Sequence, residues 1–485
     1  MSVTRPPRAV IVGSGLAGLT CARELGRRGW SVTVLTPGRA GRDGASHRVH
    51  ALAPWILLTA PWVRGDSPAR FVADLRRRGQ GRERPGLAEV LADEAHRAAV
   101  ELCSELELAT LDDRPVLLPG DAMPRGRRVI PRHRLPLLLP LLHECAAAGV
   151  QIVERAVVIG LATSGDRLTG VTCFLRESGR PTSLAADAVV LACGGVGSVF
   201  PMTTVPRWCR GSAIALASSC GVSLHAPHLT QALPVTATPP LYFPTTAALL
   251  AGRIVVDGSP FAGGTDLVAA TRVMAEAFRR GSGVALDPTG AAESLLPPKV
   301  RESSTFQRDG RVPLALALHH GVGGVAIDAW CRTSMPGLYT CGEAAGGVQG
   351  ARRTMGTGLL EARIFGQRAA AAVAKDYHRL GRAAEPVAEH LIACPAEPAA
   401  LEARIDTFIG PLTVIRPTGE LLEALAELER WPLAAEPANE RGYLAGIRRS
   451  AAMEIVSSAL ADPDAGSGFA LGDSPVRGDR PREGS

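Results

Sequence analysis

Motifs that would tie this chain to metal or nucleotide-triphosphate chemistry are missing from its sequence. Its ten cysteines include no CxxC pair and no metal-ligand spacing, and neither an HExxH nor a Walker motif occurs. A chain of 485 residues has a large core and needs no disulfide staples. We therefore expect reduced, mostly buried thiols, Cys21, Cys145, Cys193 and Cys341 among them, and no metal site.

Lysine is almost absent as well, since only Lys299 and Lys375 occur and arginine supplies nearly all the positive charge. A net charge of +6 spread over 485 residues is too dilute to favour nucleic acid, although it modestly favours small anionic substrates. The length suggests two or three domains, with the oligomeric state left open.

Long hydrophobic runs are also lacking. The N-terminal "MSVTRPPRAVIVGSGLAGL" has four apolar residues in a row before glycines intervene, so it predicts neither a signal peptide nor a membrane span. The apolar stretch 135–149, "LPLLLPLLHECAAAG", is interrupted by prolines and predicts a buried helix followed by a strand rather than a membrane-surface segment. A cytoplasmic protein is expected.

A dinucleotide-binding turn follows the first predicted strand. The strand "RAVIV" leads into "GSGLAG", then into a helical stretch that ends near Gly29, and then into a second strand "SVTVL". In this context Gly13 permits the tight turn, Gly15 lets the backbone approach a pyrophosphate, and Gly18 lets helix and strand pack closely. The second strand ends at Thr36 and Pro37, where an acidic ribose ligand is usual, so the ribose must be recognised differently.

The rest of the chain predicts an α/β protein with a Rossmann-like domain, an inserted α+β capping domain and a small C-terminal helical domain. Two further strands, within 186–200 and 335–347, end in glycines and are expected to rejoin the first sheet. The predicted boundaries are 1–232 and 317–380 for the nucleotide-binding domain, 233–316 for the capping domain, 396–460 for the helical domain and 461–485 for a flexible tail.

With "GSGLAG" at the start, "HHGVGGVAID" from residue 319 and "MPGLYTCGEAAGGVQGARRTMGTGLLEARIFGQRAA" after it, the chain resembles the fumarate reductase/succinate dehydrogenase flavoprotein family. Within that family it is most similar to the L-aspartate oxidases, because the chain is short and the helical domain small. The resemblance spans most of the chain and implies FAD across the Rossmann-like domain, with the substrate between the flavin and the capping domain.

The resemblance assigns most cofactor contacts to positions that match the family. Glu343 matches the acid near the ribityl chain, Ser212 replaces an aspartate of a TGDG-like turn, and "ALAPW", 51–55, replaces an AQGG-type stretch near the flavin ring. His47 stands near a position that attaches FAD covalently in some relatives, or is simply a polar loop residue. The implied cofactor-binding residues are Gly13, Ser14, Gly15, Leu16, Ala17, Gly18, Ser46, Ser212, Glu343, Gly358 and Leu359.

On the substrate side, the resemblance assigns His319 and Arg353 to a carboxylate clamp. A guanidinium offers a planar two-pronged donor, and a histidine adds a second donor that can carry charge. Asp121 falls where aspartate oxidases have a glutamate facing the substrate amino group, or is a solvated loop acid. His320 is a spacer or a substitute ligand, and Arg352 a second anion donor or a solvated charge.

Two family positions do not match. Leu233 replaces a substrate-contacting histidine, and Thr265 stands where the family has its catalytic arginine, whose loss typically costs ~10²–10³ in rate. Arg272, on the same predicted helix, would lie about two turns or ~10 Å away.

The resemblance therefore implies an FAD-dependent enzyme that transfers a hydride from L-aspartate to FAD. The product would be iminosuccinate, for quinolinate and NAD synthesis, and oxygen or fumarate would be the possible acceptor. Two alternatives remain: a diverged flavin oxidase or dehydrogenase acting on another carboxylic or amino acid, and a catalytically impaired flavin-binding paralogue.

Overall fold

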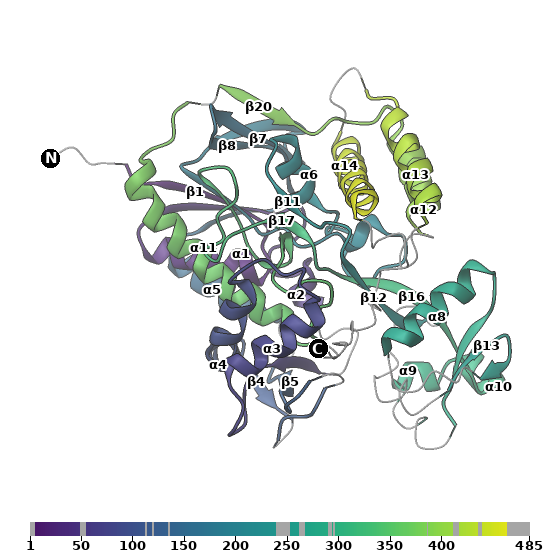
Figure 1. Ribbon diagram of the computed structural model, residues 1–485. Coiled ribbons are helices and arrows are strands. Elements are labelled where there is room, and N and C mark those ends of the chain that lie inside the picture. Colours follow the sequence, from purple (N-terminus) through teal and green to yellow (C-terminus); the bar gives the residue numbers. More distant parts are fainter. Residues whose placement is uncertain are drawn as a thin grey trace, which may run out of the picture.

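The computed structural model describes residues 5–48, 55–111, 114–118, 121–133, 136–238, 253–260, 267–289, 293, 296–385, 387–410, 417–434 and 439–462. The chain forms a large α/β part, a smaller unit at the lower right of Figure 1 and a group of helices at its upper right.

A parallel five-stranded sheet lies at the centre of the large part, in the order β18-β10-β1-β2-β6. The apolar runs predicted as strands all join it, so the carboxyl ends of β1, β2, β10 and β18 meet at one edge. The strands are β1 (Arg8–Val12), β2 (Ser31–Leu35), β6 (Gln151–Val153), β10 (Ala188–Leu191) and β18 (Leu338–Thr340).

The two faces of this sheet are covered differently. Ala9 and Ile11 of β1 belong to one core cluster with helices α1 (Leu16–Arg27) and α11 (Gly358–Leu380). Val10 and Val12 belong to a second cluster under an antiparallel sheet of order β20-β7-β8-β9. Burial on both faces explains the continuous hydrophobic run. The second sheet comprises β7 (Ala156–Ser164), β8 (Arg167–Leu175), β9 (Arg180–Ala185) and β20 (Ala388–Leu391).

Shorter elements complete the large part and lie below the central sheet in Figure 1. A three-stranded sheet of order β3-β5-β4 packs near two long helices, and a second one has the order β11-β17-β19. These elements are α2 (Ala45–Arg48), β3 (Ile56–Thr59), α3 (Pro68–Gly79), α4 (Leu87–Glu105), β4 (Leu108–Thr110), β5 (Gly126–Pro131), α5 (Leu139–Ala147), η1 (Gly197–Val199), α6 (Ser212–Ser219), β11 (Leu224–His225), β17 (Gly324–Ala326), η3 (Gly342–Ala344) and β19 (Ala345–Gly346).

The smaller unit has its own sheet and core. Two long antiparallel strands, β12 (Thr230–Thr236) and β16 (Val312–Gly321), run from the large part into a sheet of order β12-β16-β15-β13-β14. Met274 of α8, Leu286 of β15 and Leu314 are buried together in a separate cluster. The remaining elements are β13 (Arg253–Val256), β14 (Ser259–Pro260), α8 (Leu267–Arg279), β15 (Val284–Asp287), α9 (Pro298–Arg301) and α10 (Ser304–Asp309). The unit falls within the predicted insertion, 233–316, apart from the outer parts of its two long strands.

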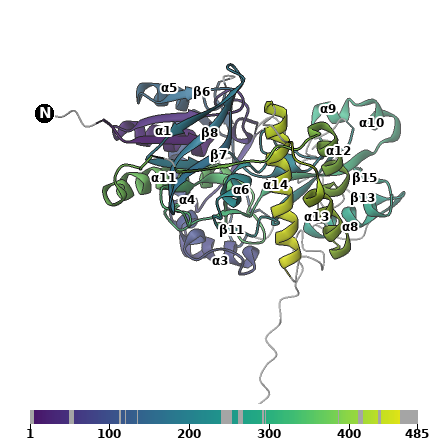
Figure 2. The same cartoon turned by 90° about the horizontal axis from the view of Figure 1, so that it is seen from above.

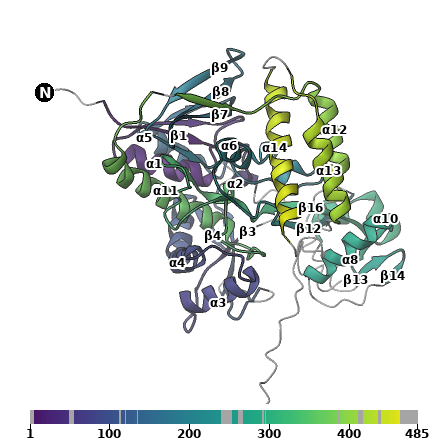
Figure 3. The same cartoon turned by 45° about the horizontal axis from the view of Figure 1, so that its top comes forward.

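Three helices close the described chain: α12 (Pro398–Ile409), α13 (Thr418–Arg430) and α14 (Glu440–Ala461). Figures 2 and 3 show α14 between α6 and the α12–α13 pair. The C-terminal end of α14 is tied to the large part, because Asp462 pairs with Arg82 and accepts from His228 Nε2 at 2.9 Å. The predicted tail lies outside the described residues except for 461 and 462.

No helix in the described ranges is both long and apolar enough to cross a bilayer.

Candidate active site

One cavity opens at the carboxyl edge of the central sheet, and most of the predicted site residues line it. Strand ends, the start of α1, the start of α11 and the end of β16 all contribute. The predicted residues found in its wall are Gly13, Ser14, Gly15, Leu16, Ala17, Ser46, Ser212, His319, Glu343, Arg353, Gly358 and Leu359.

The glycine turn is dictated by close backbone packing. Gly13 has a φ of +112°, and a Cβ there would lie 2.4 Å from the carbonyl oxygen of Ala192. A Cβ on Gly18 would lie 2.0 Å from the carbonyl oxygen of Gly13, so this glycine packs beneath the turn rather than in the cavity wall. Both roles agree with those predicted from the spacing.

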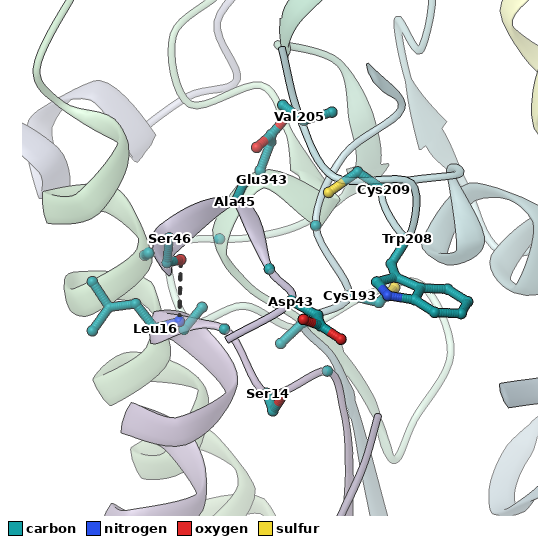
Figure 4. Close-up of a pocket in the computed structure, with 18 of the residues that line it drawn as sticks. Ser14, Leu16, Asp43, Ala45, Ser46, Cys193, Val205, Trp208, Cys209 and Glu343 are labelled. Carbon is teal, nitrogen blue, oxygen red and sulfur yellow. Dashed lines mark hydrogen bonds between the residues drawn. The ribbon is translucent and has the colours of Figure 1, made fainter. Parts of the chain in front are cut away.

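Gly15 differs from its two neighbours, because the atom nearest to an added Cβ is Ser46 Oγ at 3.5 Å. Gly15 caps the N-terminus of α1 without any side-chain hydrogen bond, and the Leu16 N–H donates to Ser46 Oγ at 3.2 Å (Figure 4). A bare helix N-terminus with open space before it suits a pyrophosphate. This turn therefore fits a dinucleotide.

The end of β2 is closed by hydroxyl groups instead of an acid. Ser14 Oγ donates to Thr36 Oγ1 at 3.0 Å. Asp43 and Trp208 line the cavity close by, and both converge on Gly38, where an added Cβ would meet Asp43 Oδ2 at 2.4 Å and Trp208 Nε1 at 2.8 Å. Asp43 is thus a candidate acid for the ribose that the position after the strand did not reveal.

Three cysteines, Cys193, Cys209 and Cys341, line the same cavity (Figure 4 shows the first two). Burial raises the pKa of both Cys193 and Cys341 to about 12. Burial also raises the pKa of Cys209, and Glu343 adds to the effect. All three are therefore neutral thiols, as expected for cysteines in apolar surroundings.

Arg353 brings a cation to the cavity. Burial lowers the pKa of its guanidinium, and the acids Glu343 and Glu361 oppose that shift. Its Nε is buried, and it has no hydrogen-bond partner within the described part of the chain. The guanidinium lies over the start of α11, since a Cβ on Gly358 would come within 2.4 Å of Arg353 Nη2. A buried, incompletely bonded guanidinium is suited to an anion.

His319 lines the same cavity from the end of β16, 34 residues earlier in the chain. Its Nδ1 lies 2.8 Å from Thr204 Oγ1. Burial, with a further contribution from Arg353, lowers the pKa of His319 to about 3. The imidazole is therefore neutral, whereas the sequence suggested a histidine able to carry charge; the difference comes from the burial and the neighbouring cation.

Glu343 is an acid held at the edge of ionisation. Burial raises its pKa to about 7, while the Gly321 N–H, which donates at 2.9 Å, and the Arg353 cation lower it. His320 Nδ1 lies 3.4 Å from Glu343 Oε2. Burial first, and then Arg353 and His319, lower the pKa of His320 well below its ordinary value, so this pair is not a salt bridge. His320 is nonetheless part of the cavity wall rather than a spacer facing outward.

The loop that carries Arg353 is held by buried polar groups. Gln349 Nε2 donates to Thr357 Oγ1 and to Glu361 Oε2, both at 2.8 Å, and Gln349 Oε1 accepts from the Thr354 N–H at 2.8 Å. Burial raises the pKa of Glu361, opposed by the Gln349 amide and by Arg353. Such a satisfied network fixes the loop conformation.

Asp121 lies elsewhere. Its carboxylate is fully buried and pairs with Arg78 Nη1 at 2.5 Å. Arg78 also donates to Thr354 Oγ1 at 3.0 Å, next to Arg353. Burial raises the pKa of Asp121, and Arg78 lowers it. Among the described residues Asp121 is not part of the cavity wall, so its predicted contact with a substrate amino group stays a prediction.

The two unmatched family positions have different outcomes. Leu233 lies in β12, partly buried and opposite Ala317. Thr265 lies outside the described residues, as do 51–54 of the stretch expected near the flavin ring. Arg272 of α8 is half-exposed and pairs with Glu276 at 3.4 Å, four residues along its own helix, so it is engaged locally.

Sequence reasoning missed Thr204, Gln349, Glu361 and Arg78. Each acts through a partner distant in sequence or through a buried network, and none stands in a motif with recognisable spacing. The run "PMTTVP" before Ser212 was the available signal for Thr204.

Comparison with protein-family models matches residues 8–359 to the FAD binding domain family. An L-aspartate oxidase from Caulobacter vibrioides is 29% identical, with 96% of this chain and 93% of the relative covered. The CoM/CoB fumarate reductase of Methanothermobacter marburgensis contains a polypeptide that is 26% identical, with 76% of this chain and 72% of that relative covered.

Solved structures show the same fold. The Mycobacterium smegmatis Sdh1 complex in its apo form is 22% identical and superposes with a TM-score of 0.76, covering 94% of this chain and 87% of that one. A variant of E. coli quinol fumarate reductase FrdA gives a TM-score of 0.75 at 16% identity, covering 94% and 89%.

Proposed function

The chain belongs to the FAD binding domain family, and on that premise we propose that it oxidises L-aspartate to iminosuccinate. The FAD cofactor predicted from the sequence is confirmed, as is the flavoprotein fold. The chain is an FAD-dependent oxidoreductase of the succinate dehydrogenase/fumarate reductase flavoprotein family.

The observation that carries the proposal is the meeting of His319 and Arg353 in the wall of the cavity that begins at the glycine turn. Arg353 presents a charged fork that matches a carboxylate, and His319 presents a neutral ring beside it. A dicarboxylic amino acid supplies a carboxylate for this pair.

FAD would be held by the turn at Gly13–Ala17, by Ser46 and by the start of α11, and when bound it accepts the hydride removed from the substrate carbon. The chain's own groups bind and orient. Arg353 neutralises a substrate carboxylate in a buried setting where charge interactions are strong. Glu343, protonated or ionised near pH 7, adjusts the charge around that guanidinium.

The test is a visible spectrum of the purified protein before and after anaerobic L-aspartate, with peroxide assayed in air. A bound flavin that bleaches supports the proposal. A bound flavin unchanged by L-aspartate, with no peroxide, rejects it. Arg404→Met is a suitable control for site variants, because Arg404 pairs with Glu427 on the surface of the helical group.

A second candidate is favoured by the pairing of Asp121 with Arg78. A cavity without an acid for the amino group would accept a carboxylate that lacks one. Bleaching that is faster with succinate or a 2-hydroxy acid than with L-aspartate would support this alternative, and strict aspartate preference would remove it.

Oxygen or fumarate is the proposed acceptor and the cytoplasm the proposed location. Reoxidation of the bleached flavin by air or by fumarate under argon separates the two acceptors.

A further inference from the structure

Thr204 meets His319 through backbone pairing between two distant segments. The Leu318 N–H donates to the Met202 carbonyl, and the Thr204 N–H donates to the Leu318 carbonyl, both at 2.9 Å. These bonds pin 202–204 beside the end of β16. The Thr204 side chain is buried, with 4% exposed, and lines the cavity. Its hydroxyl therefore reaches the His319 ring from a fixed backbone.

The hydrogen bonds around Leu318 decide where the hydroxyl proton points. The Leu318 carbonyl accepts from the Thr204 N–H and from Thr203 Oγ1, each at 2.9 Å, which occupies both lone pairs. Thr204 Oγ1 lies 3.4 Å from that carbonyl but only 2.8 Å from His319 Nδ1. The better acceptor for its proton is thus the ring nitrogen.

A neutral imidazole has one protonated nitrogen, and a hydrogen bond accepted at one nitrogen leaves the proton on the other. We propose that Thr204 is a positioning residue that holds His319 as the tautomer protonated on Nε2, so that the ring donates to a substrate oxygen beside Arg353. The inference rests on the proposed function in one respect, namely that the cavity takes a carboxylate.

This arrangement divides the work at the substrate end. Arg353 supplies the charge, and His319 supplies direction as an uncharged donor that faces acceptor oxygens only. A ring protonated on Nδ1 would instead present a bare nitrogen, which repels a carboxylate oxygen.

The first experiment reads the tautomer directly in the holoprotein. Nitrogen NMR of protein labelled with ¹⁵N-histidine, with the His319 signals assigned by their loss in His319→Asn, should show Nε2 protonated and Nδ1 unprotonated at pH 7. Thr204→Val, which keeps the shape but removes the hydroxyl, should give a mixture of tautomers. Thr204→Ser should restore the wild-type pattern. A wild-type ring protonated on Nδ1 overturns the inference even if Thr204→Val does not fold.

The second experiment measures succinate binding from the change in flavin absorbance. Thr204→Val should weaken binding about 3- to 10-fold, as expected from one mispositioned hydrogen bond, and Thr204→Ser should stay within about twofold. Equal affinities for wild type and Thr204→Val would overturn the positioning role. Failure of L-aspartate to bleach the flavin, with His319 protonated on Nε2, would reject the proposed function and leave the inference standing.

Discussion

The two ends of the cavity are built on different principles. At the nucleotide end, around Gly13 and Gly18, backbone packs against backbone so closely that no side chain is tolerated. At the other end, around Arg353 and Glu343, charged side chains are brought together and their pKa values are shifted by burial and by one another. The first end is specified by sterics and the second by electrostatic balance, so different substitutions should disturb each.

The largest effect is expected from Gly13→Ala. Strain at a φ of +112° and overlap with the Ala192 carbonyl should together lower the free energy of unfolding by about 2–5 kcal/mol and prevent FAD retention. Gly29→Ala is the matched control, because Gly29 has a φ of +79° but no neighbouring atom within 4 Å, so only about 1–2 kcal/mol should be lost. Urea unfolding measures both, and equal losses would refute the steric account.

Arg353→Met should leave the nucleotide end intact while disabling the substrate end. We expect flavin content to be unchanged and kcat/KM for the preferred acid to fall about 10²–10³-fold, because a buried cationic donor is lost. Arg353→Lys, which keeps the charge but not the fork, should fall between. Undiminished turnover in Arg353→Met, beside the Arg404→Met control, would show that the carboxylate binds elsewhere.

Arg78→Met tests how firmly the charged end is anchored. Removing the partner of fully buried Asp121 should cost about 2–4 kcal/mol of unfolding free energy and loosen Thr354. Its neighbour Arg77 pairs with Asp74 from a side chain that is 57% exposed, so Arg77→Met should cost less than about 1 kcal/mol. Similar melting curves for the two variants would argue against an anchoring role.

Glu343→Gln should alter the pH dependence of apoprotein stability. The folded-state pKa of about 7 lies above the ordinary value of 4.5, so the folded state holds the extra proton between those pH values. Stability is therefore greatest below pH 4.5 and falls as pH rises through 7. Glutamine keeps the acceptor for Gly321 and removes this loss, so the variant should gain about 1–3 kcal/mol over wild type by pH 8. Parallel stability curves from pH 4.5 to 8 would contradict the raised pKa.

The same contrast explains what could be predicted from the sequence. The glycine turn could be assigned because its spacing reports local backbone geometry, and Arg353 and Glu343 because they stand in motifs shared with a family. Thr204 and Arg78 could not, since they matter only through partners 115 and 276 residues away. The neutral state of His319 could not be foreseen either, because it arises from burial and from a cation on another segment.

The three thiols in the cavity wall provide an internal gauge of cofactor occupancy. Cys193, Cys209 and Cys341 lie where a dinucleotide would cover them, and their raised pKa values make them slow to react. Alkylation of these cysteines, mapped by mass spectrometry, should therefore increase when FAD is stripped from the protein. Their labelling would report the fraction of empty chains in a preparation without any reliance on colour or turnover.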